Sequence, residues 1–211
     1  MVRKDIAIFK KSIPDNICLV AATKYLSADE MKDFLKAGIN NFGENRVESF
    51  LEKYDQLKGE EIHWHFIGHL QRNKALKVLD KIEYLHSLDS LKLAKIIDEN
   101  VKKPLKCFVE VSINLEETKN GVPFYEAEKF VKELIKFKNI ELVGLMMMAV
   151  KNSDDSSLDN QFKKLRLLRD ELEVKFNIKL PYLSMGMSDD YLEAIKEGTT
   201  HIRLGRILLE Q

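Results

Sequence analysis

The stretch ICLVAATKYLSADE, residues 17–30, passes directly from one kind of secondary structure to another. Residues 17–22 are an uninterrupted apolar run, which is typical of a strand covered on both faces. Ser27 and Glu30 then give the S-x-x-E pattern of a capping box, which predicts the start of a helix. Lys24 stands where the strand ends. A lysine there is either a solvated charge or an amine held at a ligand site, so the ends of the other strands must decide.

The same strand-then-helix unit repeats along the whole chain. Apolar runs predict strands at 17–23, 39–42, 62–67, 82–86, 105–112, 140–147, 180–185 and 199–204. Amphipathic segments predict helices near 27–37, 45–57, 72–79, 89–101, 124–138, 156–176 and 188–197. Gly38 and Gly198 stand where helix C-caps belong, and Asp89 or Ser90 could cap the fourth helix. Residues 3–11 predict a further helix over a gap in the outer ring.

Eight strands in strict alternation with helices predict a parallel sheet, and the count fits an α/β fold of the single (β/α)8 TIM-barrel type. A doubly wound open sheet is the alternative, but such sheets seldom need eight evenly spaced units. The polar segment KNSDDSSLDN (151–160) reads as a loop and not as a linker. We therefore expect one domain over residues 1–211.

Composition excludes several classes of protein. The chain has 211 residues, 45% of them hydrophobic, which is enough for one well-buried core. Its 34 basic and 34 acidic side chains cancel, whereas a general nucleic-acid binder usually carries a basic excess. No apolar run suits a signal peptide or a membrane span. Cys18 and Cys107 lie in apolar runs and predict buried thiols. A soluble cytoplasmic protein is expected.

Chemistry-bearing residues gather where the predicted strands end. The ends in chain order are Lys24, FGEN (42–45), HFIGHLQRNK (65–74), HSLDS (86–90), VSIN (111–114), LMMMA (145–149), LSMGMS (183–188) and IRLG (202–205). In a barrel all these ends lie on one face, where functional groups collect, while the strand starts carry little chemistry. The pattern predicts a ligand site on that face.

The last two strand ends indicate what the ligand is. Gly186 and Ser188 precede a predicted helix, so backbone N–H groups and a hydroxyl would suit an anion there. Gly205 permits close backbone approach. Alternatively, Ser188 is only a helix N-cap and Gly205 a turn. A phosphate seat opposite a lysine is what pyridoxal 5′-phosphate (PLP) requires, because the aldehyde forms a Schiff base with the amine. Arg203 is the candidate for facing the ring nitrogen.

Other polar and sulfur-containing residues have simpler interpretations. His63 and His65 share one face of a strand, but no third ligand is evident, so no metal site is predicted. Arg72, Lys74 and Lys77 fit an exposed helix better than a nucleic-acid surface. Met146 to Met148 fit a core that also packs against a ligand ring.

The motifs together resemble the YggS/PROSC family of pyridoxal phosphate homeostasis proteins. The resemblance rests on AATKYL, FGENRVES, WHFIGHLQRNK, SLDS, LVGLMMMA, LSMGMSDDYLEAI and HIRLG, and runs from about residue 17 to the end. It implies a single barrel similar to the N-terminal domain of bacterial alanine racemase, the PLP fold-type III architecture. In this resemblance Lys24 matches the Schiff-base lysine and Asn45 a residue near the ring. Ser188 and Gly205 match the phosphate cradle, and Arg203 the arginine at the pyridine nitrogen.

Two further residues belong to the expected cofactor-binding set. Met187 lies between Gly186 and Ser188. Arg206 follows Gly205, where a small hydroxyl residue is frequent in the family. A cation at this position could strengthen phosphate binding or point outward.

The family resemblance implies a non-catalytic carrier that holds PLP reversibly and supplies apo-enzymes. The alternatives are a small amino-acid racemase and a cofactor-free phosphosugar enzyme in which Lys24 is an electrophile. Racemisation is disfavoured because the chain ends directly after the last strand, without the second domain that brings a tyrosine base in alanine racemase. Tyr25 is expected to point away from Lys24, since neighbours on a strand face opposite sides. A monomer is expected.

Overall fold

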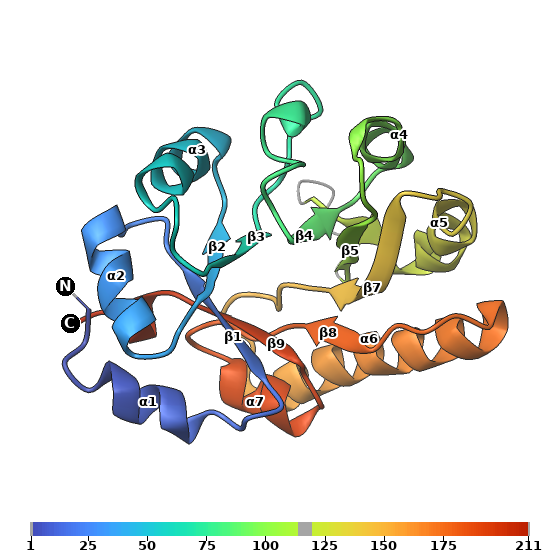
Figure 1. Cartoon of the computed structure of the whole chain (residues 1–211). Helices are drawn as coiled ribbons and strands as arrows, with labels where there is room; N and C mark the ends of the chain where they lie inside the picture. The colour runs from blue at the N-terminus through green and yellow to red at the C-terminus, as the bar shows by residue number, and fades with distance from the viewer. Residues whose placement is uncertain (1, 114–119, 211) are drawn as a thin grey trace.

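The computed structural model describes residues 2–113 and 120–210, and a closed parallel barrel forms its centre (Figure 1). Within those residues eight strands make the barrel: β1 (Cys18–Ala22), β2 (Asn41–Glu44), β3 (His63–Phe66), β4 (Tyr84–Leu88), β5 (Leu105–Ser112), β7 (Ile140–Met146), β8 (Tyr182–Ser184) and β9 (His201–Leu204). They pair in chain order, and β9 pairs with β1 to close the ring. The predicted barrel is confirmed. A two-residue strand, β6 (Val122–Pro123), adds to β5 and was not predicted.

Helices surround the barrel, as Figure 1 shows. They are α1 (Ile6–Ser12), α2 (Ala28–Lys36), α3 (Val47–Gln56), α4 (Leu91–Asn100), α5 (Ala127–Leu134), α6 (Asp155–Phe176) and α7 (Tyr191–Lys196), with short 3-10 turns η1 (Ala75–Lys77), η2 (Phe124–Glu126) and η3 (Arg206–Leu208). The capping box of α2 is present, since Ser27 Oγ accepts from the Glu30 N–H at 3.2 Å. Ser90 caps α4. Gly38 ends α2 with a φ of 77°, which favours glycine.

The predicted helix at 72–79 is wrong. Only the single turn η1 lies between β3 and β4, and the buried residues here are Ala75 in the turn and Val78 and Leu79 directly after it. Apolar residues at i, i+3 and i+4 satisfy both a one-turn segment and a longer helix, so the sequence pattern could not separate them.

The last predicted helix is shorter than expected and begins at Tyr191 rather than near residue 188. Asp190 precedes it, and its carboxylate accepts a 2.5 Å hydrogen bond from the Met187 N–H. This bond closes a turn over residues 187–190 and delays the helix. Ser188 is therefore not a helix cap, and that interpretation is excluded.

The barrel lumen is polar near its middle, although the layer between strands and helices is apolar. Six side chains from the strands share this buried interior, and each belongs to a residue at most 5% exposed: His65, His86, Glu110, Ser184, His201 and Arg203. Buried polar groups need hydrogen-bond partners, so these side chains constrain one another. That constraint governs the site described next.

Candidate functional site

Lys24 lies two residues beyond the end of β1 and is exposed. Its Nζ stands 4.7 Å from the centre of the Tyr25 ring. The expectation that Tyr25 points away from Lys24 is therefore wrong. The strand ends at Ala22, so the alternation of a strand no longer applies at these positions. No carboxylate of the described residues pairs with Lys24, which leaves the amine available to a ligand.

The turn that carries Lys24 is anchored from below by a buried ion pair. Lys53 of α3 lies 2.5 Å from a carboxylate oxygen of Glu44 and donates to the Thr23 carbonyl oxygen at 2.5 Å. The Thr23 hydroxyl donates to the same carboxylate oxygen at 2.6 Å. Since a buried charge is costly without partners, this cluster fixes the backbone directly before Lys24. This ion pair could not be predicted from the sequence, because Lys53 has the pattern of an ordinary helix lysine.

Asn45 follows β2, the neighbour of β1, and brings an unusual polar atom to this end of the barrel. Its Oδ1 is buried and has no hydrogen-bond partner within the described residues. Such orphaned acceptors are rare and call for an explanation, such as a ligand that supplies the donor. Gly68 packs against it so closely that an added Cβ would lie 2.4 Å from the Asn45 carbonyl oxygen, so only glycine fits.

Ser188 and Gly205 meet on the other side of β1. The Ser188 Oγ accepts hydrogen bonds from the Gly205 N–H at 3.2 Å and the Ile207 N–H at 3.4 Å. A Cβ added at Gly205 would lie 3.6 Å from the Ala22 side chain, so this loop touches the end of β1. Two backbone N–H groups thus converge on one hydroxyl beside the strand that leads to Lys24. Convergent donors of this kind suit an anion.

Arg203 lies in β9, and its side chain is buried. One terminal nitrogen donates to the Ser184 hydroxyl at 2.6 Å and the other to the Met147 carbonyl oxygen at 2.9 Å. Burial lowers the pKa of this guanidinium to about 10, opposed by the nearby Glu110 and Asp190, so it stays charged at neutral pH. Among the described residues, nothing accepts from its Nε–H. The Nε–H is therefore available to a ligand.

Met187 and Arg206 are less favourably arranged than expected. The Met187 N–H is already bonded to Asp190. The Arg206 side chain is 74% exposed and pairs with Asp189. This arrangement corresponds to the outward orientation, so a phosphate contact from Arg206 would require that ion pair to open.

Sequence reasoning missed Glu110, a buried carboxylate in the lumen. Burial raises its pKa to about 7, with Asp89 adding to the rise and Arg203 opposing it. A charged residue inside the apolar run CFVEVS was the available signal, since a strand buried on both faces rarely tolerates one.

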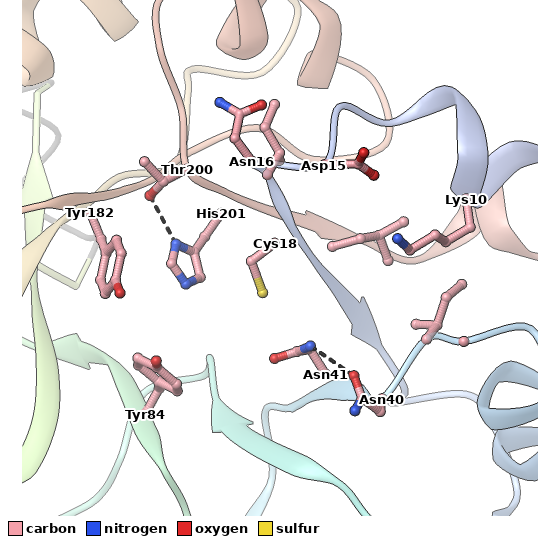
Figure 2. A pocket seen from close by; sticks show the side chains of 14 residues that line it. Lys10, Asp15, Asn16, Cys18, Asn40, Asn41, Tyr84, Tyr182, Thr200 and His201 are labelled. Atoms are coloured by element: carbon pink, nitrogen blue, oxygen red, sulfur yellow. Dashed lines mark hydrogen bonds between the residues drawn. The ribbon is translucent and has the colours of Figure 1, made fainter.

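A hollow of about 430 Å³ opens at the opposite, N-terminal end of the barrel (Figure 2). First residues of five strands line it: Cys18, Asn41, Tyr84, Tyr182 and His201. Cys18 is only partly buried, against expectation, although burial raises its pKa to about 12 and keeps the thiol neutral. Cys107 is buried as expected. None of the predicted site residues lines this hollow.

His63 lies 2.6 Å from a Glu83 carboxylate oxygen, a partner that the sequence did not reveal. Residues 2–113 and 120–210 contain no group of three or more metal-ligating side chains. Within the same residues, every helix is too short or too polar to span a bilayer.

Comparison with known proteins places the chain in a family. The model of the alanine racemase N-terminal domain matches residues 2–210. A pyridoxal phosphate homeostasis protein of Aquifex aeolicus is 38% identical over 90% of this chain and 85% of its own length. The human pyridoxal phosphate homeostasis protein is 37% identical over 89% of this chain and 74% of its own length. The chain belongs to the pyridoxal phosphate homeostasis protein family.

Solved structures agree with this family membership. PipY of Synechococcus elongatus, solved with PLP bound, superposes with a TM-score of 0.91 and 28% identity over 97% of this chain and all of PipY. Alanine racemase of Clostridium difficile shares the fold, with a TM-score of 0.80 and 17% identity over 98% of this chain and 57% of the racemase. The predicted family resemblance is confirmed.

Proposed function

We propose that this pyridoxal phosphate homeostasis family member binds PLP at the C-terminal end of its barrel, with Lys24 forming the Schiff base. The observation that carries the proposal is the convergence of the Gly205 and Ile207 N–H groups on Ser188, beside the strand that leads to Lys24. The PLP-bound PipY structure supports the same ligand. One barrel domain is sufficient for this site.

The polar groups of the site fit the parts of PLP. The Ser188 hydroxyl would donate to the phosphate, and the two N–H groups that donate to Ser188 would share their hydrogen bonds with it, all charge-assisted. The free Nε–H of Arg203 would donate to the ring nitrogen. The orphaned Asn45 Oδ1 would accept a hydrogen bond from a donor near the ring. When bound, PLP supplies a reactive aldehyde and an electron-accepting ring.

We propose that the protein is a carrier rather than an enzyme. An arginine at the ring nitrogen keeps that nitrogen unprotonated, because the guanidinium does not give up its proton, and this makes the ring a weaker electron sink. The relatives carry homeostasis names rather than enzyme names, which supports this role. Reversible binding suits delivery to apo-enzymes, from a monomer in the cytoplasm.

The decisive experiment is covalent labelling of the PLP-loaded protein. Borohydride should remove the yellow colour and fix PLP on a single peptide that contains Lys24, and Lys24→Ala should yield no adduct. Lys32→Ala is a matched control, since Lys32 is a partly exposed lysine of α2 paired only with Asp29. An adduct on Lys74 instead would disprove the assignment.

The racemase alternative retains one supporting observation, the contact between Tyr25 and Lys24. Solvent-deuterium exchange at the α-carbon of alanine separates the two functions. A carrier should exchange no faster than free PLP does. Exchange well above that rate, lost in both Lys24→Ala and Tyr25→Phe, would establish an enzyme.

A further inference from the structure

A continuous chain of side-chain hydrogen bonds crosses the barrel lumen from Arg203 toward the opposite face. Arg203 contacts the Ser184 hydroxyl at 2.6 Å, and Ser184 contacts His86 Nδ1 at 2.8 Å. His86 Nε2 lies 2.9 Å from His65 Nδ1. His65 Nε2 lies 3.0 Å from Asn41 Oδ1. We call these five residues the lumen chain.

The Arg203 end of the lumen chain is compatible with one direction for every hydrogen bond. A guanidinium only donates, so Ser184 accepts from Arg203 and keeps its single proton available for His86 Nδ1. In that direction His86 donates from Nε2 to His65, and His65 donates from Nε2 to Asn41.

The Asn41 end of the lumen chain requires this direction. The Asn41 amide nitrogen donates to Asn40 Oδ1 at 3.1 Å, a bond visible in Figure 2, so Asn41 Oδ1 is the acceptor. Each imidazole is therefore held neutral as the Nε2–H tautomer.

The surroundings reinforce this proton arrangement. Burial, and then the neighbouring histidines, lower the pKa of both His65 and His86 well below the usual histidine value. His86 also stacks on Phe108 with ring centres 4.4 Å apart, and His65 on Tyr84 at 4.6 Å. A half-turn of either ring would keep its plane but move both nitrogens away from their hydrogen-bond partners.

The lumen chain is not a path for proton transfer. It ends on an amide oxygen, which does not take up a proton at neutral pH, and it begins on a guanidinium, which does not release one. Its remaining physical effect is orientation. Ser184 and Met147 each accept from one terminal nitrogen of Arg203, and this fixes the plane of the guanidinium and the direction of its Nε–H.

We propose that Ser184, His86 and His65 are positioning residues that fix Arg203 as a hydrogen-bond donor to the ring nitrogen of PLP. This inference rests on the proposed function, since it requires PLP in the site. It assigns a role to lumen residues that lie outside the predicted cofactor-binding set. The strength of the Arg203 contact then depends on residues that never touch the cofactor.

The first test is nitrogen-15 NMR of the histidine side chains in the wild-type protein. Both His65 and His86 should give neutral Nε2–H signals, and these should persist from pH 8 to pH 6. An Nδ1–H tautomer or an imidazolium at either position breaks the required direction and overturns the proposal. This result does not depend on PLP, so it is separable from a failure of the proposed function.

The second test removes the first link of the lumen chain. Ser184→Ala should weaken PLP binding about tenfold, equivalent to about 1.4 kcal/mol. It should also shift the visible band of the loaded protein and the nitrogen-15 signal of labelled PLP. Ser184→Thr, which restores a hydroxyl, should return all three readouts toward wild type. If Ser184→Ala does not fold, Ser184→Cys keeps the volume with a weaker hydrogen bond.

Ser87→Ala is the matched control for general loosening. Ser87 is also buried, and its hydroxyl donates to the Gly68 carbonyl oxygen at 2.6 Å, outside the lumen chain. In Ser87→Ala, the nitrogen-15 signal of the PLP ring should stay at the wild-type position. An unchanged Ser184→Ala protein, or equal shifts in both variants, would refute the positioning role. Wild-type protein that forms no lysine adduct would refute the proposed function instead.

Discussion

At the scale of single residues, the site combines groups that keep a donor or an acceptor available with groups whose partners fix them. Ser188 belongs to the first kind, because its hydroxyl accepts from two N–H groups and keeps its own proton for a ligand. Arg203 belongs to the second, with both terminal nitrogens bound to protein. The contrast separates residues that would grip a ligand from those that would orient it.

We predict that Ser188→Ala weakens the binding of PLP more than that of pyridoxal, which lacks the phosphate. Loss of one hydrogen bond to a charged group should reduce PLP affinity about tenfold. Pyridoxal affinity should change by less than about twofold, since the ring and aldehyde contacts are untouched. Fluorescence titration of both ligands measures the difference. Equal losses for the two ligands would mean that Ser188 serves only the loop.

The raised pKa of Glu110 predicts that the free energy of unfolding depends on pH. Its pKa is raised above that of the unfolded chain, to about 7, so its contribution is fully present below pH 4.5 and is lost as pH rises through 7. Glu110→Gln should therefore raise the free energy of unfolding at pH 8 by on the order of 3 kcal/mol relative to wild type. At pH 4.5 the difference should shrink toward zero. Urea unfolding at the two pH values tests this, and a pH-independent difference contradicts it.

Residues that stand at the ends of strands could be predicted from the sequence. Lys24, Asn45 and Ser188 stand at strand ends, and the structure brings them to one end of the barrel. The directions of Tyr25 and Arg206 could not be predicted. Both lie beyond a strand end, where loop backbone rather than strand alternation sets where a side chain points.

At the scale of elements, the contact between β2 and α3 matters most for the site. Glu44 ends β2, Lys53 lies on α3, and both side chains are at most 9% exposed. Together they bind Thr23 at the base of the turn before Lys24. The helix thereby controls a loop it does not belong to.

We predict that Lys53→Met destabilises the protein by about 3–5 kcal/mol, because it leaves the Glu44 carboxylate buried and unpaired. Adding Glu44→Gln should recover part of this loss. Lys58→Met is the matched control, since Lys58 pairs with Asp55 on the surface and should cost less than about 1 kcal/mol. Urea unfolding supplies the energies. If Lys53→Met costs no more than Lys58→Met, the buried pair does not anchor the turn.

The type of each helix or strand was easier to predict from the sequence than its length. All eight barrel strands fell within or close to the predicted runs. The predicted helices at 72–79 and 188–197 were both too long, for a shared reason. In each region a turn or a side chain makes backbone hydrogen bonds that a longer helix would otherwise make. Apolar periodicity records which residues are buried, but not how many turns bury them.

At the scale of the whole molecule, the barrel lumen contains three neutral histidines. His65, His86 and His201 come from β3, β4 and β9, and burial lowers the pKa of each, that of His201 to about 4. Closure of the barrel buries all three together. Their ionisation is therefore linked to unfolding of the whole domain.

We predict that the protein loses stability as pH falls from 7 to 5. A group with a lowered folded pKa stabilises the fold above its unfolded value of about 6.5, and that contribution is lost as pH falls toward the folded value. Glu110 acts in the opposite sense over this range, so Glu110→Gln should lose stability more steeply than wild type. Thermal unfolding across the range measures both slopes. A wild-type midpoint that rises on acidification would contradict the prediction.

The direction of the lumen chain also bears on how the barrel assembles. Asn41, His65 and His86 come from the first half of the chain, whereas Ser184 and Arg203 come from the last strands. The His86–Ser184 bond joins residues 98 positions apart. In a half-barrel intermediate, one end of the lumen chain would lack its hydrogen-bond partner, because that partner comes from the other half of the barrel. The two halves therefore gain little by forming separately, which favours all-or-none folding over stepwise growth from half-barrels.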